Sequence, residues 1–327
     1  MKIYGKESVI RSLSAMSGSG RFPHTIIFTG ESGIGKNTAA KFTAMLMMCE
    51  NPRTENGLMS PCGICRACRR IEGRSHPDVI YPEVSGKMLI YSRETMRNVV
   101  SDAYVKPNDA DIKIYIFEHF EDTDKASQNV LLKVVEDPPE GVRFIFTASG
   151  KTAFLPTVLS RAVTIAVPET NAAETAEALR DSGKYTEEQI TLAVSSFPGN
   201  VGNCTAFLEG GRIAVLRERT MEIIDAVIRA DEYALLAAFA AIGENRTDAR
   251  EAAAMSAKIV RDAAMLIIDD KTPTIGCWHQ GALKLAKQMT KRRAADMYGK
   301  FAKAAEDLTG SVNVALTFSA LAAKLHT

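Results

Sequence analysis

The chain has 327 residues, of which 46% are hydrophobic, 24% charged and 7% aromatic. This composition, at about twice the length of a typical domain, favours two or three ordinary globular units and excludes a largely disordered chain. The 40 basic and 39 acidic residues leave a net charge of +1, which excludes a chain-wide attraction for a polyanion. Any nucleic-acid contact therefore needs a local basic patch.

No apolar run reaches the roughly 18 to 20 residues that a helix needs to cross a bilayer. The longest candidates, such as ALLAAFAAIG from Ala234, have about half that length. The first residues, MKIYGKESVIRSLS, contain no apolar segment of the kind that a secretory signal requires. We therefore expect a cytoplasmic protein without membrane contact, in which clustered cysteines more often bind metal than form disulfides.

Five short runs rich in β-branched and aromatic residues predict strands in the first half of the chain. They are TIIFT (25–29), DVIY (78–81), KIYIF (113–117), RFIFTA (143–148) and VTIAV (163–167). Helical or loop segments separate them, and nearly continuous apolar strands that alternate with helices indicate a parallel sheet covered on both faces. The sequence thus predicts an α/β domain over residues 1–168.

Beyond Pro168 the strand signals disappear, and Ala, Leu, Glu and Arg dominate. This part is predicted to be mostly helical, with breaks at SSFPGNVGN (195–203) and EGGR (209–212). The second break separates a small helical unit, 169–208, from a longer one, 212–327. In the last predicted helix an apolar stripe recurs at helical spacing, which indicates either core packing or a subunit contact. Its members are Val314, Phe318, Leu321 and Leu325.

The stretch GESGIGKNTAA has the spacing of a phosphate-binding loop, GxxxxGK[ST], up to its last position. Gly30, Gly33 and Gly35 follow a predicted strand and precede a helical pattern, which is the context that such a loop requires. Backbone N–H groups and the helix N-terminus there favour a phosphate, and Lys36 supplies a positive charge for it. The sequence predicts binding of ATP or ADP, and a relic loop that stays empty is the alternative.

The residues expected to handle the metal and the water depart from an ATPase pattern. Asn37 stands where a hydroxyl normally ligates Mg²⁺, and Thr38 points about 100° away from that direction on a helix. At the end of a later strand, in KIYIFEHFEDTD, Glu118 and His119 occupy the places of the metal-binding acid and the catalytic glutamate. Glu118 remains a candidate metal ligand, but an imidazole does not replace a carboxylate base, so hydrolysis is expected to be absent or weak.

Four cysteines, Cys49, Cys62, Cys65 and Cys68, lie within twenty residues and form two CxxC pairs that share Cys65. Four thiolates close a tetrahedral shell around zinc, and the loop-forming stretch NPRTENGLMSPCG allows Cys49 to join the others. A redox role for one CxxC pair would leave two thiols without a task. The sequence therefore predicts a structural zinc site with no open position for water.

Several stretches together resemble the bacterial clamp-loader ATPase family, within the wider AAA+ class. They are RFPHTIIFTGESGIGK, the cysteine insert directly after the helix, HPDV, SQNVLLKVVEDPPE and LPTVLSRA. The resemblance covers the first 210 residues by motif and the rest by helical character, with SVNVALTFSALAAKL similar to the final collar helix. It implies an AAA+ domain with a zinc insert at about 49–70, a helical lid over 169–208 and an oligomerisation collar over 212–327.

The family contains motor subunits, which hydrolyse ATP, and delta-prime subunits of DNA polymerase III, which often do not. Asn37, His119 and Gly202, the last at the position of a lid arginine, depart from the motor pattern and favour the delta-prime type. Arg161 in SRA matches the arginine that relatives direct at the ATP of a neighbouring subunit. The resemblance thus implies a hetero-oligomer with motor and delta-like subunits that loads a sliding clamp onto primed DNA during replication.

Two alternatives remain open from the sequence. The first is an active motor subunit of the gamma/tau type, and His119 is the residue that opposes it. The second is a zinc-dependent nucleic-acid-binding module, because the insert and the residues after it carry Arg53, Arg66, Arg69 and Arg70 as well as Arg74.

Overall fold

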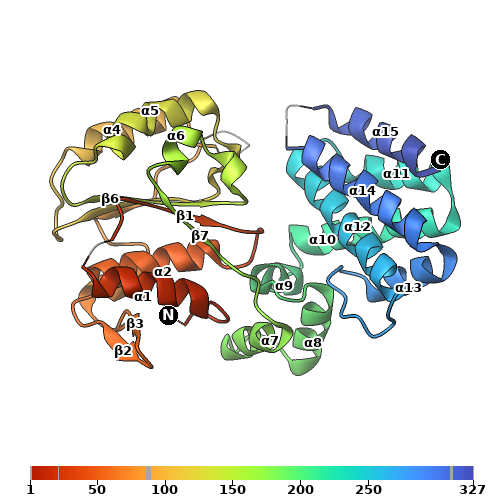
Figure 1. The fold of residues 1–327 in the computed structure, drawn as a ribbon, viewed down its shortest axis with the longest axis horizontal. Helices are drawn as coiled ribbons and strands as arrows, with labels where there is room; N and C mark the ends of the chain where they lie inside the picture. The colour runs from red at the N-terminus through yellow and green to blue at the C-terminus, as the bar shows by residue number, and fades with distance from the viewer. Residues whose placement is uncertain (1, 21, 86–89, 310–311, 327) are drawn as a thin grey trace. The chain divides into compact units, whose positions relative to one another are not determined.

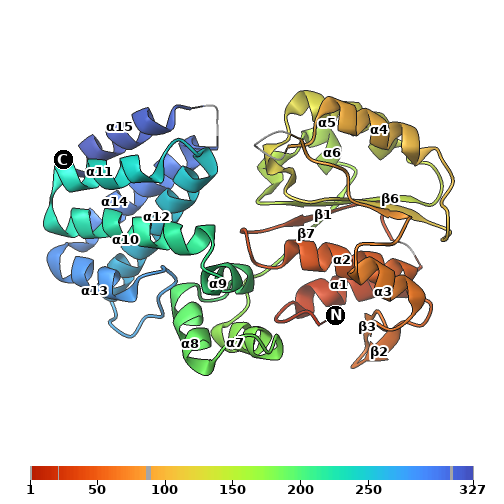
Figure 2. The same cartoon turned by 180° about the vertical axis from the view of Figure 1, so that it is seen from behind.

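The computed structural model describes residues 2–20, 22–85, 90–309 and 312–326. It divides into two compact units, Met1–Thr170 and Asn171–Thr327, which we describe one after the other (Figures 1 and 2). Arg21 and Ser311, which belong to two of the stretches that carry the family resemblance, lie outside the described residues.

The first unit contains a five-stranded parallel sheet in the order β4-β5-β6-β1-β7. Its strands are β1 (Thr25–Thr29), β4 (Val79–Ile80), β5 (Lys113–Phe117), β6 (Val142–Ala148) and β7 (Val163–Ala166). All five strands that the sequence predicts are present, and the bounds of three differ from the prediction by one or two residues. Because the strands are parallel, the residues that follow β1, β5 and β6 meet at one edge of the sheet.

The two faces of the sheet bury different side chains, as the alternation of successive residues along a strand requires. One face presents mainly aliphatic groups, such as Ile26 in β1 and Ile116 in β5. The other is aromatic, and Phe117 and Phe146 stack on it with ring centroids 4.8 Å apart. Both faces are therefore dry, which explains why the strands read as continuous apolar runs.

Helices cover both faces of this sheet (Figure 1). The aliphatic face packs against α1 (Glu7–Gly18), α2 (Lys36–Met48) and α3 (Arg66–Glu72). The aromatic face packs against α4 (Arg93–Ala103), α5 (Lys125–Glu136) and α6 (Pro156–Leu159). Short 3₁₀ turns, η1 (Phe120–Asp122) and η2 (Lys151–Ala153), follow β5 and β6.

The stretch between Cys49 and Cys62, which the sequence predicts to be a loop, contains a β-hairpin. Strands β2 (Arg53–Glu55) and β3 (Leu58–Ser60) pair in antiparallel fashion. Asn56 and Gly57 both have positive φ, 51° and 77°, which is the backbone that a two-residue hairpin turn needs. The loop prediction was therefore wrong here, because Asn-Gly between short strands is itself a hairpin signal.

The second unit contains nine helices and no strand within the residues that the structure describes. They are α7 (Ala172–Asp181), α8 (Glu187–Ser196), α9 (Val201–Leu208), α10 (Arg212–Arg229), α11 (Glu232–Ile242), α12 (Arg246–Leu266), α13 (His279–Gln288), α14 (Lys291–Asp307) and α15 (Val314–His326). This confirms the predicted helical character. None of the helices in the described ranges is both long and apolar enough to span a bilayer.

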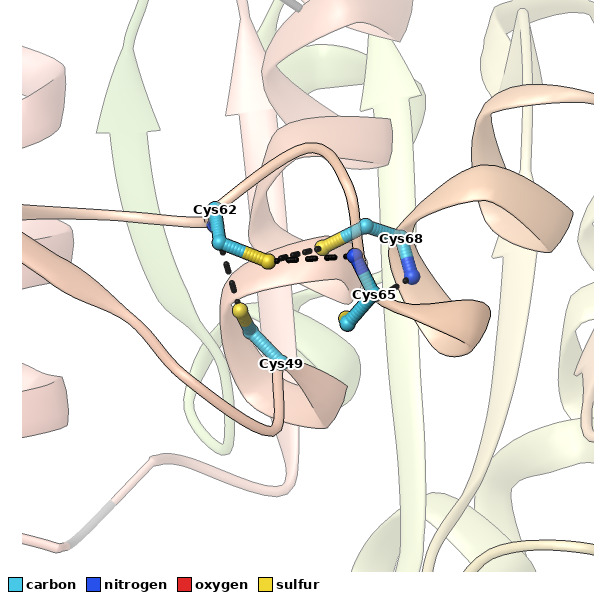
Figure 3. A group of neighbouring side chains, drawn as sticks. All are labelled: Cys49, Cys62, Cys65 and Cys68. Carbon is cyan, nitrogen blue, oxygen red and sulfur yellow. Dashed lines mark hydrogen bonds between the residues drawn. The ribbon is translucent and has the colours of Figure 1, made fainter.

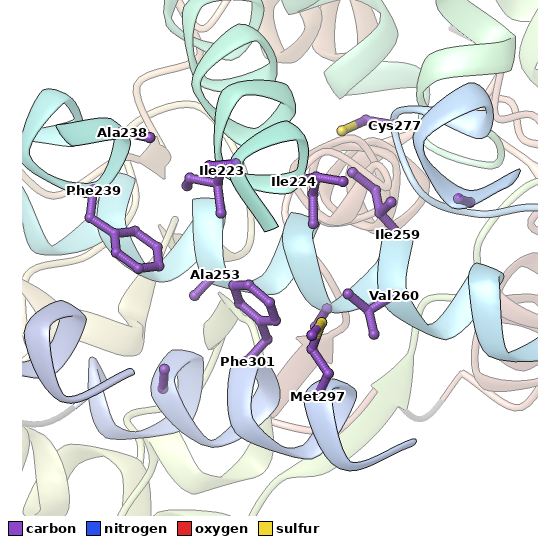
Figure 4. Close-up of a cluster of buried hydrophobic side chains, with 14 of the residues drawn as sticks. Ile223, Ile224, Ala238, Phe239, Ala253, Ile259, Val260, Cys277, Met297 and Phe301 are labelled. Atoms are coloured by element: carbon purple, nitrogen blue, oxygen red, sulfur yellow. The ribbon is translucent and has the colours of Figure 1, made fainter. Parts of the chain in front are cut away.

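One hydrophobic cluster runs through this unit from Leu179 in α7 to Leu325 in α15. Figure 4 shows part of it, where Ile224 of α10, Val260 of α12 and Phe301 of α14 converge. Phe318 belongs to the apolar stripe of the last helix and stacks on Phe239 with centroids 4.5 Å apart. All four stripe residues are buried, so the core-packing interpretation of the stripe is confirmed.

Candidate nucleotide site and thiol cluster

The predicted phosphate loop connects the carboxyl end of β1 to the amino end of α2. Gly30 has φ of 149°, and a Cβ there would lie 2.3 Å from Ile34 Cδ1 and 2.9 Å from the carbonyl oxygen of Val167. Gly35, with φ of 100°, is the N-cap of α2 and provides no side-chain cap. The first N–H groups of α2 thus face the loop without a capping side chain, as in anion-binding helix termini.

Lys36 is only 4% exposed, and its ammonium group is engaged by the loop itself. Nζ donates hydrogen bonds to the carbonyl oxygens of Gly30 at 2.8 Å and Glu31 at 2.6 Å. Burial lowers the pKa of Lys36, while the negative charges of Glu121 and Glu31 act in the opposite direction. Lys36 therefore lies where the sequence predicts it, but a phosphate has to compete with two carbonyl oxygens for its charge.

Asn37 and His119, the two departures from the motor pattern in this unit, contact each other. The hydroxyl of Thr147, at the end of β6, accepts a hydrogen bond from the His119 backbone N–H at 3.1 Å and donates one to Asn37 Oδ1 at 2.8 Å. This turns Asn37 Nδ2 toward the imidazole, 3.3 Å from Nε2. His119 itself has a left-handed backbone, with φ of 55°. A closed ring of hydrogen bonds thus joins α2 to the ends of β5 and β6.

Glu118, the predicted metal ligand, is held by a salt bridge. Its Oε1 lies 2.6 Å from Nη2 of Arg74, and the hydroxyl of Tyr91 donates to its backbone carbonyl at 2.8 Å. The hydrogen bond to Glu118 raises the pKa of Arg74 above its ordinary value. We refer to Lys36, Asn37, Glu118, His119 and Thr147 as the loop corner.

Two other predicted loop residues belong to the same region. Gly33 has a positive φ of 81°, and Thr38 lies half-buried in the first turn of α2. Sequence reasoning did not identify Thr147 as part of the corner or Arg74 as the partner of Glu118. For Thr147 a signal existed, since it is a polar residue at the carboxyl end of a buried strand. For Arg74 there was none, because its contact depends on how the insert packs.

The four cysteines that the sequence predicts to form one site lie close together (Figure 3). Cys49 ends α2, and Cys65 is the N-cap of α3. All four Sγ atoms lie within 4.8 Å of one another, and those of Cys62 and Cys68 are 3.9 Å apart. Ligands around tetrahedral zinc with Zn–S bonds of about 2.3 Å are roughly 3.8 Å apart. We call these residues the thiol cluster, and their spacing and soft sulfur donors fit zinc.

Backbone N–H groups point at the sulfur atoms of the thiol cluster. The N–H groups of Cys62, Cys65 and Cys68 donate to the Sγ of Cys49, Cys62 and Cys65 at 3.2, 3.3 and 3.4 Å. Hydrogen bonds from the N–H groups of Ile64 and Cys65 lower the pKa of Cys62 to about 6, whereas burial raises the pKa of Cys68. The cluster therefore already contains part of the hydrogen bonding that orients metal-bound thiolates.

Three of the five arginines in and after the insert are paired with carboxylates of the first unit. Arg66 and Arg70 lie 3.4 and 2.5 Å from Asp109 Oδ2, and Arg74 pairs with Glu118. Arg53 and Arg69 are exposed. Much of the positive charge that the sequence places on the insert is thus neutralised locally, which weakens the case for a basic nucleic-acid face.

Arg161 lies between α6 and β7 with 42% of its side chain exposed. Nη2 is 3.3 Å from Glu136 Oε1, and Nη1 donates to the Thr157 carbonyl at 3.1 Å and to Ser160 Oγ at 3.2 Å. These partners come from the end of α5 and from α6 with the residue after it. Gly202, at the predicted lid-arginine position, lies in α9 of the second unit.

A parallel sheet with this strand order and a glycine loop between β1 and α2 is the α/β domain of the AAA+ class, followed here by a helical unit, as the sequence predicts. A family model described as "DNA polymerase III, delta subunit" matches residues 5–171. The match spans half of the chain, and the chain therefore belongs to this family. This confirms the resemblance to the clamp-loader proteins.

Relatives with curated descriptions match about half of the chain. DNA polymerase III subunit tau of Escherichia coli (strain K12) is 30% identical over 159 residues, which are 49% of this chain and 24% of that protein. DNA polymerase III subunit gamma of Buchnera aphidicola subsp. Acyrthosiphon pisum is also 30% identical over 159 residues, or 49% of this chain and 42% of that protein. The chain thus spans less than half the length of these two relatives.

Solved structures resemble the chain over nearly its whole length at low identity. A DNA polymerase III gamma subunit-related protein from Thermotoga maritima is 13% identical with a TM-score of 0.48, covering 97% of this chain and 98% of that one. The Bacillus subtilis DNA clamp loader delta protein is 12% identical with a TM-score of 0.35, covering 97% and 99%.

Proposed function

We propose that this chain is a delta-prime-like subunit of the DNA polymerase III clamp loader that does not itself hydrolyse ATP and donates Arg161 to a neighbouring ATPase subunit. Its membership in the family supports a place in that assembly. Its partners are then motor subunits and a delta-like subunit, and through them the sliding clamp and primed DNA. Residues 169–208 serve as the lid and residues 212–327 as the collar that holds the assembly together.

The loop corner carries this proposal. Hydrolysis needs Mg²⁺ on a hydroxyl and an acid, and a water molecule aligned by a carboxylate. Here the group in the hydroxyl position, Asn37, is bonded to Thr147 and His119, and the acid, Glu118, is bonded to Arg74. Each group that would meet the metal or the water thus already has a protein partner. This favours a corner that binds ATP or ADP weakly through its loop and does not cleave it.

Arg161 meets the physical requirement for an arginine that acts on a neighbour. It is partly exposed, and its salt bridge with Glu136 joins two side chains that are each about two-fifths exposed, 42% and 41%. Such exposed pairs contribute about 0 to 1 kcal/mol, so the guanidinium is released at little cost. A guanidinium that stabilises the transferring phosphoryl group from a neighbouring subunit accelerates hydrolysis by about 10³ to 10⁵.

The thiol cluster is proposed to hold one zinc ion in a structural role. Its four ligands complete a tetrahedral shell, so zinc would be closed to water. The chemistry that zinc supplies there is cross-linking of the end of α2, the hairpin and the start of α3. This role is part of the fold and takes no part in phosphoryl transfer.

Equilibrium ATP binding and steady-state turnover by the purified chain, alone and mixed with a motor subunit, test the proposal. We expect no turnover above background from the chain alone and stimulation of the mixture. The Lys36→Ala variant should leave that stimulation unchanged. Brisk turnover by the chain alone, abolished by Lys36→Ala, would replace the proposal by the motor assignment, which the tau and gamma relatives favour.

Arg161→Ala tests the donated guanidinium separately. The reconstituted complex should assemble normally, as measured by size-exclusion chromatography. Turnover at the one active site that receives this arginine should fall at least about tenfold, so the total ATPase rate should fall by about the share that this site contributes. Arg143→Ala, which removes a guanidinium from the start of β6 in the same unit, is the matched control. An unchanged ATPase rate for Arg161→Ala would remove this residue from the mechanism.

A further inference from the structure

The backbone of Arg74 is held at the C-terminal end of α3, the helix whose N-cap is Cys65 of the thiol cluster. Cys65 caps α3 and Cys68 lies in its first turn, while Arg74 follows its last turn. The N–H of Arg74 donates to the Ile71 carbonyl at 3.1 Å, and the N–H of Ser75 donates to the Arg70 carbonyl at 2.8 Å. These bonds place Arg74 in the left-handed region, with φ of 52°, where a non-glycine residue is uncommon.

The same helix is packed against the helix of the phosphate loop. Cys68 and Ile71 of α3 are fully buried in one cluster with Phe42 and Met45 of α2. Lys41 Nζ of α2 also donates to the backbone carbonyl of Glu72 at 3.3 Å. The direction of Arg74 is therefore set by a packed segment that extends from the cysteines to the loop helix.

The Arg74 guanidinium contacts both the carboxylate of Glu118 and the ring of Tyr81. Its Nη2 is 2.6 Å from Glu118 Oε1, and its central carbon lies 4.4 Å from the ring centroid of Tyr81. Arg74 is half-exposed, but the carboxylate that it binds is only 20% exposed. The aromatic face favours the cation, and the short charge-assisted bond holds one oxygen of the carboxylate.

A guanidinium and a divalent cation compete for the same carboxylate. Mg²⁺ needs oxygen ligands at about 2.0 to 2.1 Å and is repelled by a positive charge already placed there. Arg74 approaches Glu118 from the end of α3, directly after the insert, rather than from the loop or the sheet. It thus supplies the positive charge that a metal supplies in an active site.

We infer that Arg74, positioned by α3 and the thiol cluster, takes the place of the divalent metal on Glu118, so that the insert keeps the loop corner from loading a metal–nucleotide complex. This inference rests on the proposed function, because it takes Glu118 to lie at the metal-binding position. It gives the cysteine insert a task beyond stability. Arg74 is a positioning residue here, since it acts on the carboxylate and not on a substrate.

The test is the effect of Mn²⁺ on the affinity of the full chain for a fluorescent ATP analogue, measured with Mn²⁺ and with EDTA. Mn²⁺ is used because it accepts mixed oxygen and nitrogen ligands. The unmodified chain should respond weakly or not at all. Arg74→Met, which keeps an aliphatic stem near Tyr81, and Arg74→Gln should each gain a Mn²⁺-dependent increase in affinity of about tenfold, because one charge-assisted bond no longer competes.

Two controls distinguish this effect from loosening of the insert. Arg69→Gln removes an exposed arginine from the same helix and should behave like the unmodified chain. Arg74→Met combined with Glu118→Gln should lose the gain, because the carboxylate is then absent. Circular dichroism and zinc content should be unchanged in all variants that are compared.

The inference is overturned if the Arg74 variants respond to Mn²⁺ as the unmodified chain does, including the case in which neither binds the analogue. It is also overturned if the gain persists without Glu118. The proposed function fails in a different experiment, by ATP turnover of the unmodified chain, so the two failures are distinguishable.

Discussion

The thiol cluster and the loop corner are two polar sites of the same unit. They differ in which groups bond to the side-chain atoms that could bind a metal. In the thiol cluster the four sulfur atoms face one another and accept hydrogen bonds from backbone N–H groups. In the loop corner the side chains of Asn37, His119 and Glu118 are bonded to other side chains. The sulfur atoms of the first site are arranged so that they could hold a metal ion, whereas the side chains of the second site are bonded to protein groups.

This difference shows that the shape of a site and its chemistry are stabilised by separate residues. Gly30 and Gly35 preserve the backbone of the loop, and β1 and β6 fix its position at the edge of the sheet. None of these features depends on whether Asn37 or a hydroxyl follows Lys36. The shape of the loop therefore does not depend on which groups stand at the predicted metal and water positions.

The largest effect is expected at the thiol cluster, where Cys68→Ser should remove a buried thiol that we propose as a zinc ligand. In small peptides structural zinc supplies about 10 to 16 kcal/mol of apparent binding energy, so the insert should lose its order and the first unit should lose on the order of several kcal/mol of stability. Zinc content measured by mass spectrometry and thermal unfolding with and without a chelator check this.

Cys204→Ala is the matched control for that variant, because Cys204 is equally buried but lies in α9 of the second unit. It should cost stability through a small cavity and leave zinc content unchanged. If the unmodified chain binds no zinc, and a chelator leaves its unfolding transition in place, the assignment of the thiol cluster is wrong.

A smaller but still large effect is expected at Asp78, which directly precedes β4. Its carboxylate is fully buried and accepts hydrogen bonds from the N–H groups of Asn108, Asp109 and Ala110 at 2.6, 2.7 and 3.0 Å. Asp109 in turn binds Arg70 of α3. Asp78→Asn turns an amide N–H toward N–H donors and should cost about 2 to 3 kcal/mol in chemical denaturation at pH 7.

The pH dependence of this effect has a definite sign. Burial acts to raise the pKa of Asp78, but the three backbone N–H groups outweigh it and hold that pKa below its ordinary value. The stability from this carboxylate is then fully present above about pH 4 and is lost as pH falls through the lower folded-state pKa. The difference between the unmodified chain and Asp78→Asn should shrink in acid. The exposed Asp111→Asn is the control at pH 7, where it should cost little stability.

Much of the fold could be predicted because its signals are local. The strand TIIFT is buried along its whole length, and the cysteine spacing places four thiols within reach of one another. In the second unit, Asn171 and Thr186 form capping boxes with Glu174 and Gln189, so the starts of α7 and α8 can be read from the sequence.

The contacts of the loop corner could not be predicted in the same way. Arg74 and Glu118 are 44 residues apart, and Thr147 and Asn37 are 110 apart. Their meeting depends on the left-handed backbone of Arg74 and His119 and on the register of parallel strands. Residue types at single positions predict how the corner differs from an ATPase pattern, but only the packing shows which protein groups contact Asn37, Glu118 and His119.

Asn37→Ala should have a moderate effect, which measures how much the hydrogen bonds of the loop corner contribute to the free energy of unfolding. It removes the acceptor for Thr147 and the contact with His119, and partly buried hydrogen bonds of this kind contribute about 1 kcal/mol in sum. Denaturant unfolding should show a loss of that size, and the exposed Asn98→Ala on α4 should show little change. An unaltered midpoint for Asn37→Ala would mean that the ring of hydrogen bonds contributes nothing to stability.

Glu136→Gln should have the smallest effect on stability, and it extends the comparison to Arg161. Arg161 forms a salt bridge with Glu136, as Arg74 does with Glu118. Glu136 is 41% exposed whereas Glu118 is 20% exposed, so the Arg161 pair should be the weaker one. Freeing Arg161 should raise the ATPase rate of the reconstituted complex by a factor of at most about five, the equivalent of up to about 1 kcal/mol. The exposed Glu140→Gln is the control, and a decrease for Glu136→Gln alone would indicate that Glu136 orients the guanidinium rather than competes for it.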